Sequence, residues 1–89
     1  MRKSITVLIA DDHPIFRKGL AGVLREDPSI QLVAEAGDGE TALRQIQELK
    51  PNVAILDLDM PGMNGLEVAK KVFQSKIETA PVILTMHKE

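Results

Sequence analysis

The sequence predicts an α/β domain built on a parallel sheet, and three observations lead to that fold class. Short apolar runs alternate with longer segments in which apolar residues recur at helical spacing. The first run, residues 5–10, is continuously apolar after Thr6, which is typical of a parallel strand buried on both faces. Proline and glycine mark the boundaries between the segments. The resulting order is βαβαβαβ, and such alternation implies right-handed crossovers within a single sheet.

The first half of the chain predicts two helices separated by a strand. Pro14 suits the first turn of a helix that ends at Pro28. A strand at residues 32–34 follows, and Asp38 is expected to cap the second helix. Lys50 ends that helix, because the residue before a proline avoids helical geometry. The apolar positions are Ile15, Phe16, Leu20, Val23 and Leu24 in the first helix, and Ala42, Leu43, Ile46 and Leu49 in the second.

The second half predicts a third strand, a third helix and a fourth strand. The third strand covers residues 53–56 and the fourth covers residues 82–84. Asn64 and Glu67 are spaced as a capping box, in which each side chain bonds to the backbone of the other residue, so the third helix is expected to begin there. The residues predicted to form the buried face of this helix are Leu66, Ala69, Val72 and Phe73.

Composition limits the classes of function. The chain has 89 residues, enough for at most one domain, and its formal net charge of −2 lacks the basic excess of a nucleic-acid-binding domain. The absence of cysteine excludes disulfides and thiolate chemistry, and it agrees with a cytoplasmic location. No apolar run approaches the ~20 residues needed to span a bilayer.

Three carboxylates directly follow two of the apolar strands. Asp11 and Asp12 follow the first strand, and Asp57 follows the third. Ligands of open α/β sheets bind beyond the carboxyl ends of the strands, so these acids are expected to converge at one edge of the sheet. Like charges in one small space repel each other unless a cation lies among them, and Mg²⁺ with its oxygen ligands suits that position. The pattern therefore indicates metal-assisted phosphate chemistry.

Asp57 is the candidate nucleophile. A carboxylate fixed at a strand end can attack a phosphoryl donor and form an aspartyl phosphate. Asp12 and Asp57 are expected to bind Mg²⁺ directly and Asp11 through water, with the backbone carbonyl of Asp59 as a further ligand. Thr85 follows the fourth strand, where its hydroxyl can donate a hydrogen bond to a phosphoryl oxygen on Asp57.

Each of these residues also has a purely structural interpretation. Asp11 or Asp12 can cap the first helix and Asp57 can open a turn, since aspartate is common in both places. Thr85 can be an ordinary strand residue. The joint placement of the three acids beside two strands favours the functional interpretation. His13 is interpreted as a solvated turn residue, with proton transfer or phosphate acceptance as the less favoured alternative.

Residues 7–12, 53–65 and 83–85 together resemble the receiver domain of two-component response regulators. The pairs at 13–14 and 86–87, His-Pro and Met-His, resemble more particularly the NarL/FixJ type, whose members usually carry a C-terminal helix-turn-helix. The resemblance implies a flavodoxin-like (CheY-like) doubly wound parallel sheet with strand order 2-1-3-4. It also implies signal transduction rather than enzymatic turnover, with a sensor histidine kinase as the phosphoryl source.

The same resemblance assigns the site residues. Asp57 is then the phosphoacceptor, and Asp11 and Asp12 are the acidic pair that holds Mg²⁺. The backbone carbonyl of Asp59 is a further metal ligand, and Thr85 carries the switch hydroxyl.

The family pattern has five βα units, whereas this sequence stops just after the fourth strand. It lacks the counterparts of the fourth helix, the fifth strand and the fifth helix, with the family's conserved lysine and aromatic switch residue. We therefore expect residues 1–89 to form a partial receiver domain without an output domain, so that DNA binding belongs to a longer parent protein. The exposed fourth strand predicts a homodimer or higher oligomer, which a concentration-independent monomer in sedimentation would contradict.

Two other functions remain open from the sequence alone. Residues 57–59, Asp-Leu-Asp, also resemble the Asp-x-Asp start of haloacid-dehalogenase-type phosphatases, in which the second aspartate acts as acid and base. The acid pair precedes Asp57 rather than following it, and this order favours the receiver. The chain can also be an inert remnant that folds only as an oligomer. Steady turnover of a phosphomonoester would indicate the phosphatase, and one slow Mg²⁺-dependent phosphorylation would indicate the receiver.

Overall fold

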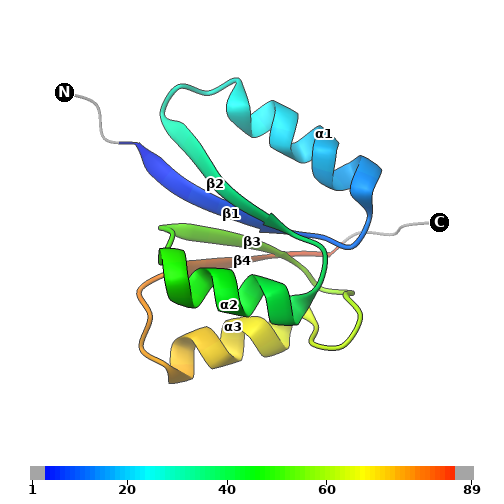
Figure 1. The fold of residues 1–89 in the computed structure, drawn as a ribbon, viewed down its shortest axis with the longest axis vertical. Helices are drawn as coiled ribbons and strands as arrows, with labels where there is room; N and C mark the ends of the chain where they lie inside the picture. Colours follow the sequence, from blue (N-terminus) through cyan, green and yellow to red (C-terminus); the bar gives the residue numbers. More distant parts are fainter. Residues whose placement is uncertain (1–3, 86–89) are drawn as a thin grey trace.

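The computed structural model describes residues 4–85 as three layers (Figure 1). A four-stranded parallel sheet with the order β2-β1-β3-β4 forms the middle layer. Helix α1 covers one face of the sheet, and α2 and α3 lie side by side on the other (Figure 1). The elements are β1 Ile5–Ala10, α1 Pro14–Arg25, β2 Ile30–Ala36, α2 Gly39–Leu49, β3 Val53–Asp57, α3 Gly65–Gln74 and β4 Ala80–Leu84. The predicted fold class, element order and strand order are confirmed.

The strand register aligns the carboxyl ends of the central strands. Ala10 of β1 lies between Ala36 of β2 and Leu56 of β3. At the opposite edge, the backbone N–H and the hydroxyl of Thr6 both donate to Asn52 Oδ1 at 2.9 Å, which fixes β1 against the start of β3. The residues that follow Ala10 and Leu56 therefore occupy neighbouring positions at one edge of the sheet.

The main core lies between the sheet and the pair α2 and α3. Its members are small and medium aliphatic side chains, together with one methionine, and they fill the space without an aromatic ring. The buried members are Leu8, Ala10, Ala36, Ala42, Ile46, Ala54, Leu56, Met60, Val68 and Val72. This packing stabilises the contact between β1 and β3, because burial of each leucine, isoleucine, valine or methionine side chain contributes about 1.5–3 kcal/mol.

The predicted starts of α2 and α3 are confirmed. Asp38 caps α2, with its Oδ1 accepting a hydrogen bond from the backbone N–H of Thr41 at 2.8 Å. That bond, followed by the bond from the Thr41 hydroxyl, holds the pKa of Asp38 below its ordinary value, because both bonds favour the ionised carboxylate. Asn64 and Glu67 form the expected capping box, with reciprocal bonds of 2.9 and 3.0 Å.

The predicted buried face of α3 is wrong at two positions. Leu66 is 57% exposed and Phe73 is 83% exposed, whereas Val68 and Val72 are almost completely buried. Val68 and Val72 are four residues apart and share the face that meets the sheet. Leu66 and Phe73 each lie one residue beyond a buried position, which turns them about 100° away around the helix. Sequence periodicity identified the helix but misjudged its rotation.

Several apolar positions in the other elements are also exposed. Ile15 is 90% and Val23 is 64% exposed on α1, and Leu49 is 50% exposed at the end of α2. On β4, Val82 is 45% exposed. Strand β2 is longer than the predicted 32–34, since it covers Ile30–Ala36.

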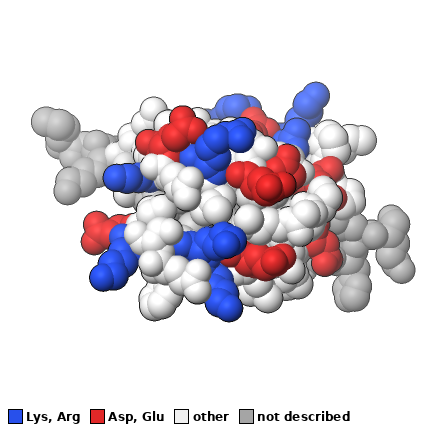
Figure 2. Space-filling model, turned by 60° about the horizontal axis from the view of Figure 1, so that its bottom comes forward, with Lys and Arg blue, Asp and Glu red and all other residues white. Residues whose placement is uncertain are grey.

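On the face that α2 and α3 form, lysine and arginine are interspersed with aspartate and glutamate (Figure 2). Among residues 4–85, no helix combines the length and the apolar content that crossing a membrane requires. The Met-His pair at 86–87, noted in the sequence, lies outside the described residues.

Candidate functional site

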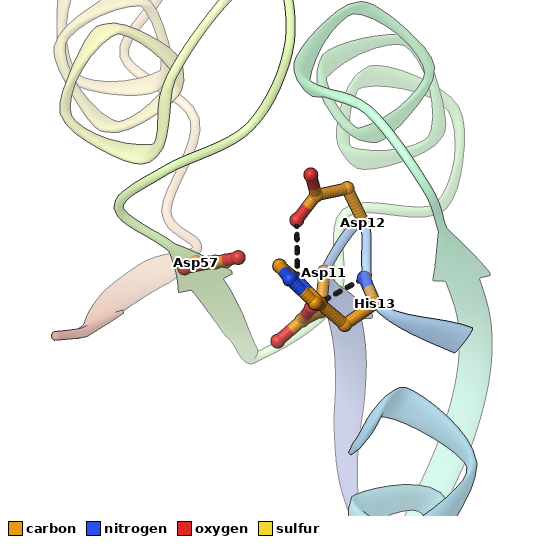
Figure 3. Close-up of side chains that lie close together, drawn as sticks. All are labelled: Asp11, Asp12, His13 and Asp57. Carbon is orange, nitrogen blue, oxygen red and sulfur yellow. Dashed lines mark hydrogen bonds and ion pairs between the residues drawn. The ribbon is translucent and has the colours of Figure 1, made fainter. Parts of the chain in front are cut away.

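Three aspartates and one histidine come together at the carboxyl edge of the sheet (Figure 3). Asp11, Asp12 and His13 follow β1, and Asp57 is the last residue of β3. Each residue offers one potential ligand atom, and these atoms all lie within 4.8 Å of one another. The structure thus brings together the three acids that the strand pattern placed at one edge.

Two of the acids are buried and the other two residues are accessible. Asp11 is 0% exposed and Asp57 is 2% exposed. The side chains of Asp12 and His13 are 29% and 49% exposed. The carboxylates of Asp11 and Asp57 therefore form the buried part of the site. An ion or a phosphoryl donor can approach from the side of Asp12 and His13.

Hydrogen bonds orient the carboxylates. Asp11 Oδ1 accepts from the backbone N–H of His13 at 2.8 Å, and Asp57 Oδ1 accepts from the backbone N–H of Asp59 at 3.2 Å. His13 Nδ1 lies 2.9 Å from Asp12 Oδ1 and 3.5 Å from Asp11 Oδ1. An ionised carboxylate has two oxygens and about four lone-pair sites, so these bonds leave it able to bind a cation as well.

The structure excludes the interpretation of Asp11 or Asp12 as the cap of the first helix. The N-cap residue of α1 is His13 rather than Asp11 or Asp12, and its side chain makes no cap hydrogen bond. His13 lies in the turn before α1 with its side chain 49% exposed, as the solvated interpretation predicts, and its Nδ1 also pairs with Asp12 in the acidic cluster. The residue order alone could not reveal this pairing, which depends on the turn of the chain between β1 and α1.

Two glycines permit close backbone contacts around the site, and sequence reasoning missed both. A Cβ atom on Gly65 would lie 2.5 Å from the carbonyl oxygen of Asp57, and one on Gly39 would lie 1.9 Å from the carbonyl oxygen of Met63. Real Cβ atoms do not approach so closely, so α3 and the loop after β3 depend on glycine at these positions. The contact at Gly65 connects the start of α3 directly to Asp57.

Asp59 and Thr85 lie beside the cluster. Leu84 of β4 pairs with Asp57 of β3, and the carbonyl of Leu84 accepts a hydrogen bond from the backbone N–H of Leu58 at 3.0 Å. Thr85 therefore comes next along the chain at the same edge of the sheet, with an exposed side chain. The roles assigned to the Thr85 hydroxyl and to the Asp59 carbonyl stay predictions.

The donor set fits a hard divalent cation. Carboxylate oxygens are the protein ligands that Mg²⁺ prefers, and one or two of them suffice because the ion keeps several waters. Two buried carboxylates in one small space also repel each other, and a cation between them relieves that repulsion.

A doubly wound parallel sheet with acids from β1 and β3 at its carboxyl edge defines a class of α/β domains whose site lies at a strand switch point. The sequence model of the response regulator receiver domain family matches residues 7–89 of this chain. The chain belongs to the response regulator receiver domain family.

Individual relatives support this assignment. The chain is 39% identical over 87 residues to the probable transcriptional regulatory protein NarL of Mycobacterium tuberculosis, a match that covers 98% of this chain and 40% of that protein. The solved receiver domain of the putative response regulator NarL from the same organism superposes with a TM-score of 0.93 at 39% identity, covering 98% of this chain and 70% of that one.

The structure of a longer protein also contains a domain similar to this chain. RcsB from Salmonella enterica serovar Typhimurium, bound to promoter P1flhDC in the presence of the phosphomimetic BeF3−, matches with a TM-score of 0.85 at 30% identity. That match covers 96% of this chain and 43% of RcsB. The chain spans about 40% of the length of the NarL protein from Mycobacterium tuberculosis.

Proposed function

We propose that this receiver domain accepts a phosphoryl group on Asp57 from a sensor histidine kinase, with Mg²⁺ held by Asp11, Asp12 and Asp57. One observation carries the proposal: the buried carboxylate at the end of β3 points toward the acids that follow β1 (Figure 3). A lone buried aspartate has many structural explanations, whereas a cluster of acids from two strands needs a cation to relieve its repulsion.

The residues of the chain supply position and charge for the transfer. A carboxylate oxygen of Asp57 forms the new bond to phosphorus, while the bond between phosphorus and the kinase histidine or a small acyl donor breaks. The Asp59 N–H holds one oxygen of Asp57 at 3.2 Å and so orients the carboxylate for an in-line approach. Bound Mg²⁺ would neutralise the charge on the transferred oxygens.

The Asp59 carbonyl and the Thr85 hydroxyl complete the proposed site. The carbonyl would add an oxygen ligand to the ion. The hydroxyl would donate to a phosphoryl oxygen on Asp57, from the position that follows the strand paired with Asp57. In a longer parent protein that has the remaining elements, a new charge at this edge would shift an equilibrium between two conformers, which is how a local modification reaches a distant surface. Residues 1–89 by themselves are expected to switch little.

The output of the whole protein is part of this proposal. The NarL relative is named as a transcriptional regulator, and RcsB was solved on promoter DNA. We propose that in a longer parent protein this receiver controls a DNA-binding domain. Self-association of the chain across β4 stays a prediction. The family match favours the receiver over the phosphatase, since the matched residues 7–89 include both strand ends that carry the acids.

Chelation of divalent metal is expected to prevent phosphorylation. With acetyl phosphate and Mg²⁺, intact-mass spectrometry of the chain should show the gain of one phosphoryl group, and addition of EDTA before acetyl phosphate should abolish that gain. Equal labelling with and without EDTA would contradict the role of the metal. Steady release of phosphate from a small phosphomonoester, without a labelled protein, would support the phosphatase instead.

A further inference from the structure

An arginine on α1 reaches the backbone of the acidic site. Arg17 Nη1 donates to the carbonyl oxygen of Asp11 at 2.7 Å, and the same nitrogen lies 3.5 Å from the carbonyl oxygen of Ala36. The Asp11 carbonyl belongs to the peptide that joins Asp11 to Asp12. A charged donor at this distance makes a strong hydrogen bond, so the guanidinium fixes the plane of the peptide that carries both acids.

The same guanidinium lies within ion-pair distance of a carboxylate on β2, although its Nε makes no hydrogen bond there. Arg17 Nε lies 3.5 Å from Glu35 Oε1, and Arg25 Nη2 lies 3.3 Å from Glu35 Oε2. The side chain of Arg17 is 22% exposed, so solvent screens these interactions less than it screens those of Arg25, which is 61% exposed. Arg17 thus connects α1, the end of β1 and the end of β2, with its charge directed at the Asp11 carbonyl.

The guanidinium of Arg17 packs close to the backbone at Gly37. A Cβ atom on Gly37 would lie 3.1 Å from Arg17 Nη1, closer than most real Cβ contacts. Gly37 directly follows Ala36, whose carbonyl accepts from the backbone N–H of Asp11 at 3.0 Å. The guanidinium therefore lies against the chain just after β2, and a Cβ atom at position 37 would require Nη1 to shift by a few tenths of an ångström.

We propose that Arg17 is a positioning residue for the acidic site, acting through the Asp11–Asp12 peptide rather than by contact with the ion or the phosphoryl group. This inference rests on the proposed function, because it assumes that these acids bind Mg²⁺. Groups that orient metal ligands typically change metal affinity by about 10–100-fold when they are removed. Without Arg17 the peptide can rotate, and the Asp11 and Asp12 carboxylates lose their fixed spacing to Asp57.

Isothermal titration of Mg²⁺ into the full chain tests the inference. Arg17→Ala is expected to raise the dissociation constant for Mg²⁺ by about 10–100-fold. Arg17→Lys should recover part of that loss, because lysine keeps a charged donor but lacks the planar fork that reaches both partners. Gly37→Ala keeps the arginine and crowds Nη1, so it should weaken binding in the same direction and by less.

Arg25→Ala is the matched control. It removes an ion pair to the same Glu35 but makes no hydrogen bond to Asp11, so Mg²⁺ affinity should stay at the wild-type value. All variants are compared at a temperature where circular dichroism shows them folded. If Arg17→Ala does not fold, the test uses Gly37→Ala, and unchanged Mg²⁺ affinity in that variant would overturn the role of Arg17. If Arg17→Ala lowers thermal stability but leaves Mg²⁺ affinity unchanged, the positioning role of Arg17 is overturned and the proposed function is not. A wild-type chain that binds no Mg²⁺ would overturn the proposed function first, and this inference with it.

Discussion

Replacement of Asp57 by asparagine is expected to abolish phosphorylation by acetyl phosphate. The amide has nearly the same shape as the carboxylate and fits the same buried place, but it is not a nucleophile toward phosphorus. The variant should also melt at a higher temperature than wild type in Mg²⁺-free buffer. Asp57 and Asp11 are both buried in one cluster, and removal of one charge relieves their repulsion.

The measurements are intact mass after incubation with acetyl phosphate and Mg²⁺, and thermal unfolding in EDTA. Asp27→Asn is the matched control, since Asp27 lies near the opposite edge of the sheet, where it bonds to the backbone N–H and the hydroxyl of Ser29. The control should be labelled like wild type. A labelled Asp57→Asn protein would mean that another residue receives the phosphoryl group.

Replacement of Gly65 by alanine is expected to damage both the fold and the site. The added Cβ would lie 2.5 Å from the carbonyl oxygen of Asp57 and 3.3 Å from Leu58 Cα, so the start of α3 or the end of β3 must shift. Overpacking of this kind typically costs about 1–3 kcal/mol of unfolding free energy. A displacement of Asp57 by about 1 Å can slow the transfer by about 10²-fold.

Gly22→Ala is expected to preserve both stability and labelling, in contrast to Gly65→Ala. Gly22 lies in α1, and a Cβ atom there meets nothing within 4 Å. Alanine is a better helix former than glycine by about 0.8–1.0 kcal/mol, so this variant should be slightly more stable and fully active. Urea unfolding and the rate of acetyl phosphate labelling compare the two variants. Equal stability and labelling of Gly65→Ala and wild type would show that the close contact at Asp57 is not required.

Sequence reasoning predicted the features that depend on local pattern. The continuous apolar run of β1 indicated a doubly buried strand, and β1 proved to be central in the sheet. The caps at Asp38 and Asn64 were predictable because their hydrogen bonds join residues only three positions apart in the sequence. The meeting of Asp11 and Asp57 followed from the topology, because parallel strands in one sheet place their carboxyl ends together.

Features that depend on packing between distant elements could not be read in the same way. The rotation of α3 depends on which side chains fit the sheet, so Phe73 was wrongly assigned to the buried face. The need for glycine at position 65 arises from a backbone contact with Asp57 that no local motif encodes. The reach of Arg17 to the Asp11 carbonyl likewise requires α1 to lie at one particular place over the sheet.

Paramagnetic broadening by Mn²⁺ tests the central claim most directly. If acids from two separate strand ends bind one ion, small amounts of Mn²⁺ added to isotopically labelled protein should broaden the backbone amide signals of residues 11–13 and 57–59 together. Excess Mg²⁺ should restore both sets. Broadening at only one strand end would contradict a shared metal site at Asp11, Asp12 and Asp57.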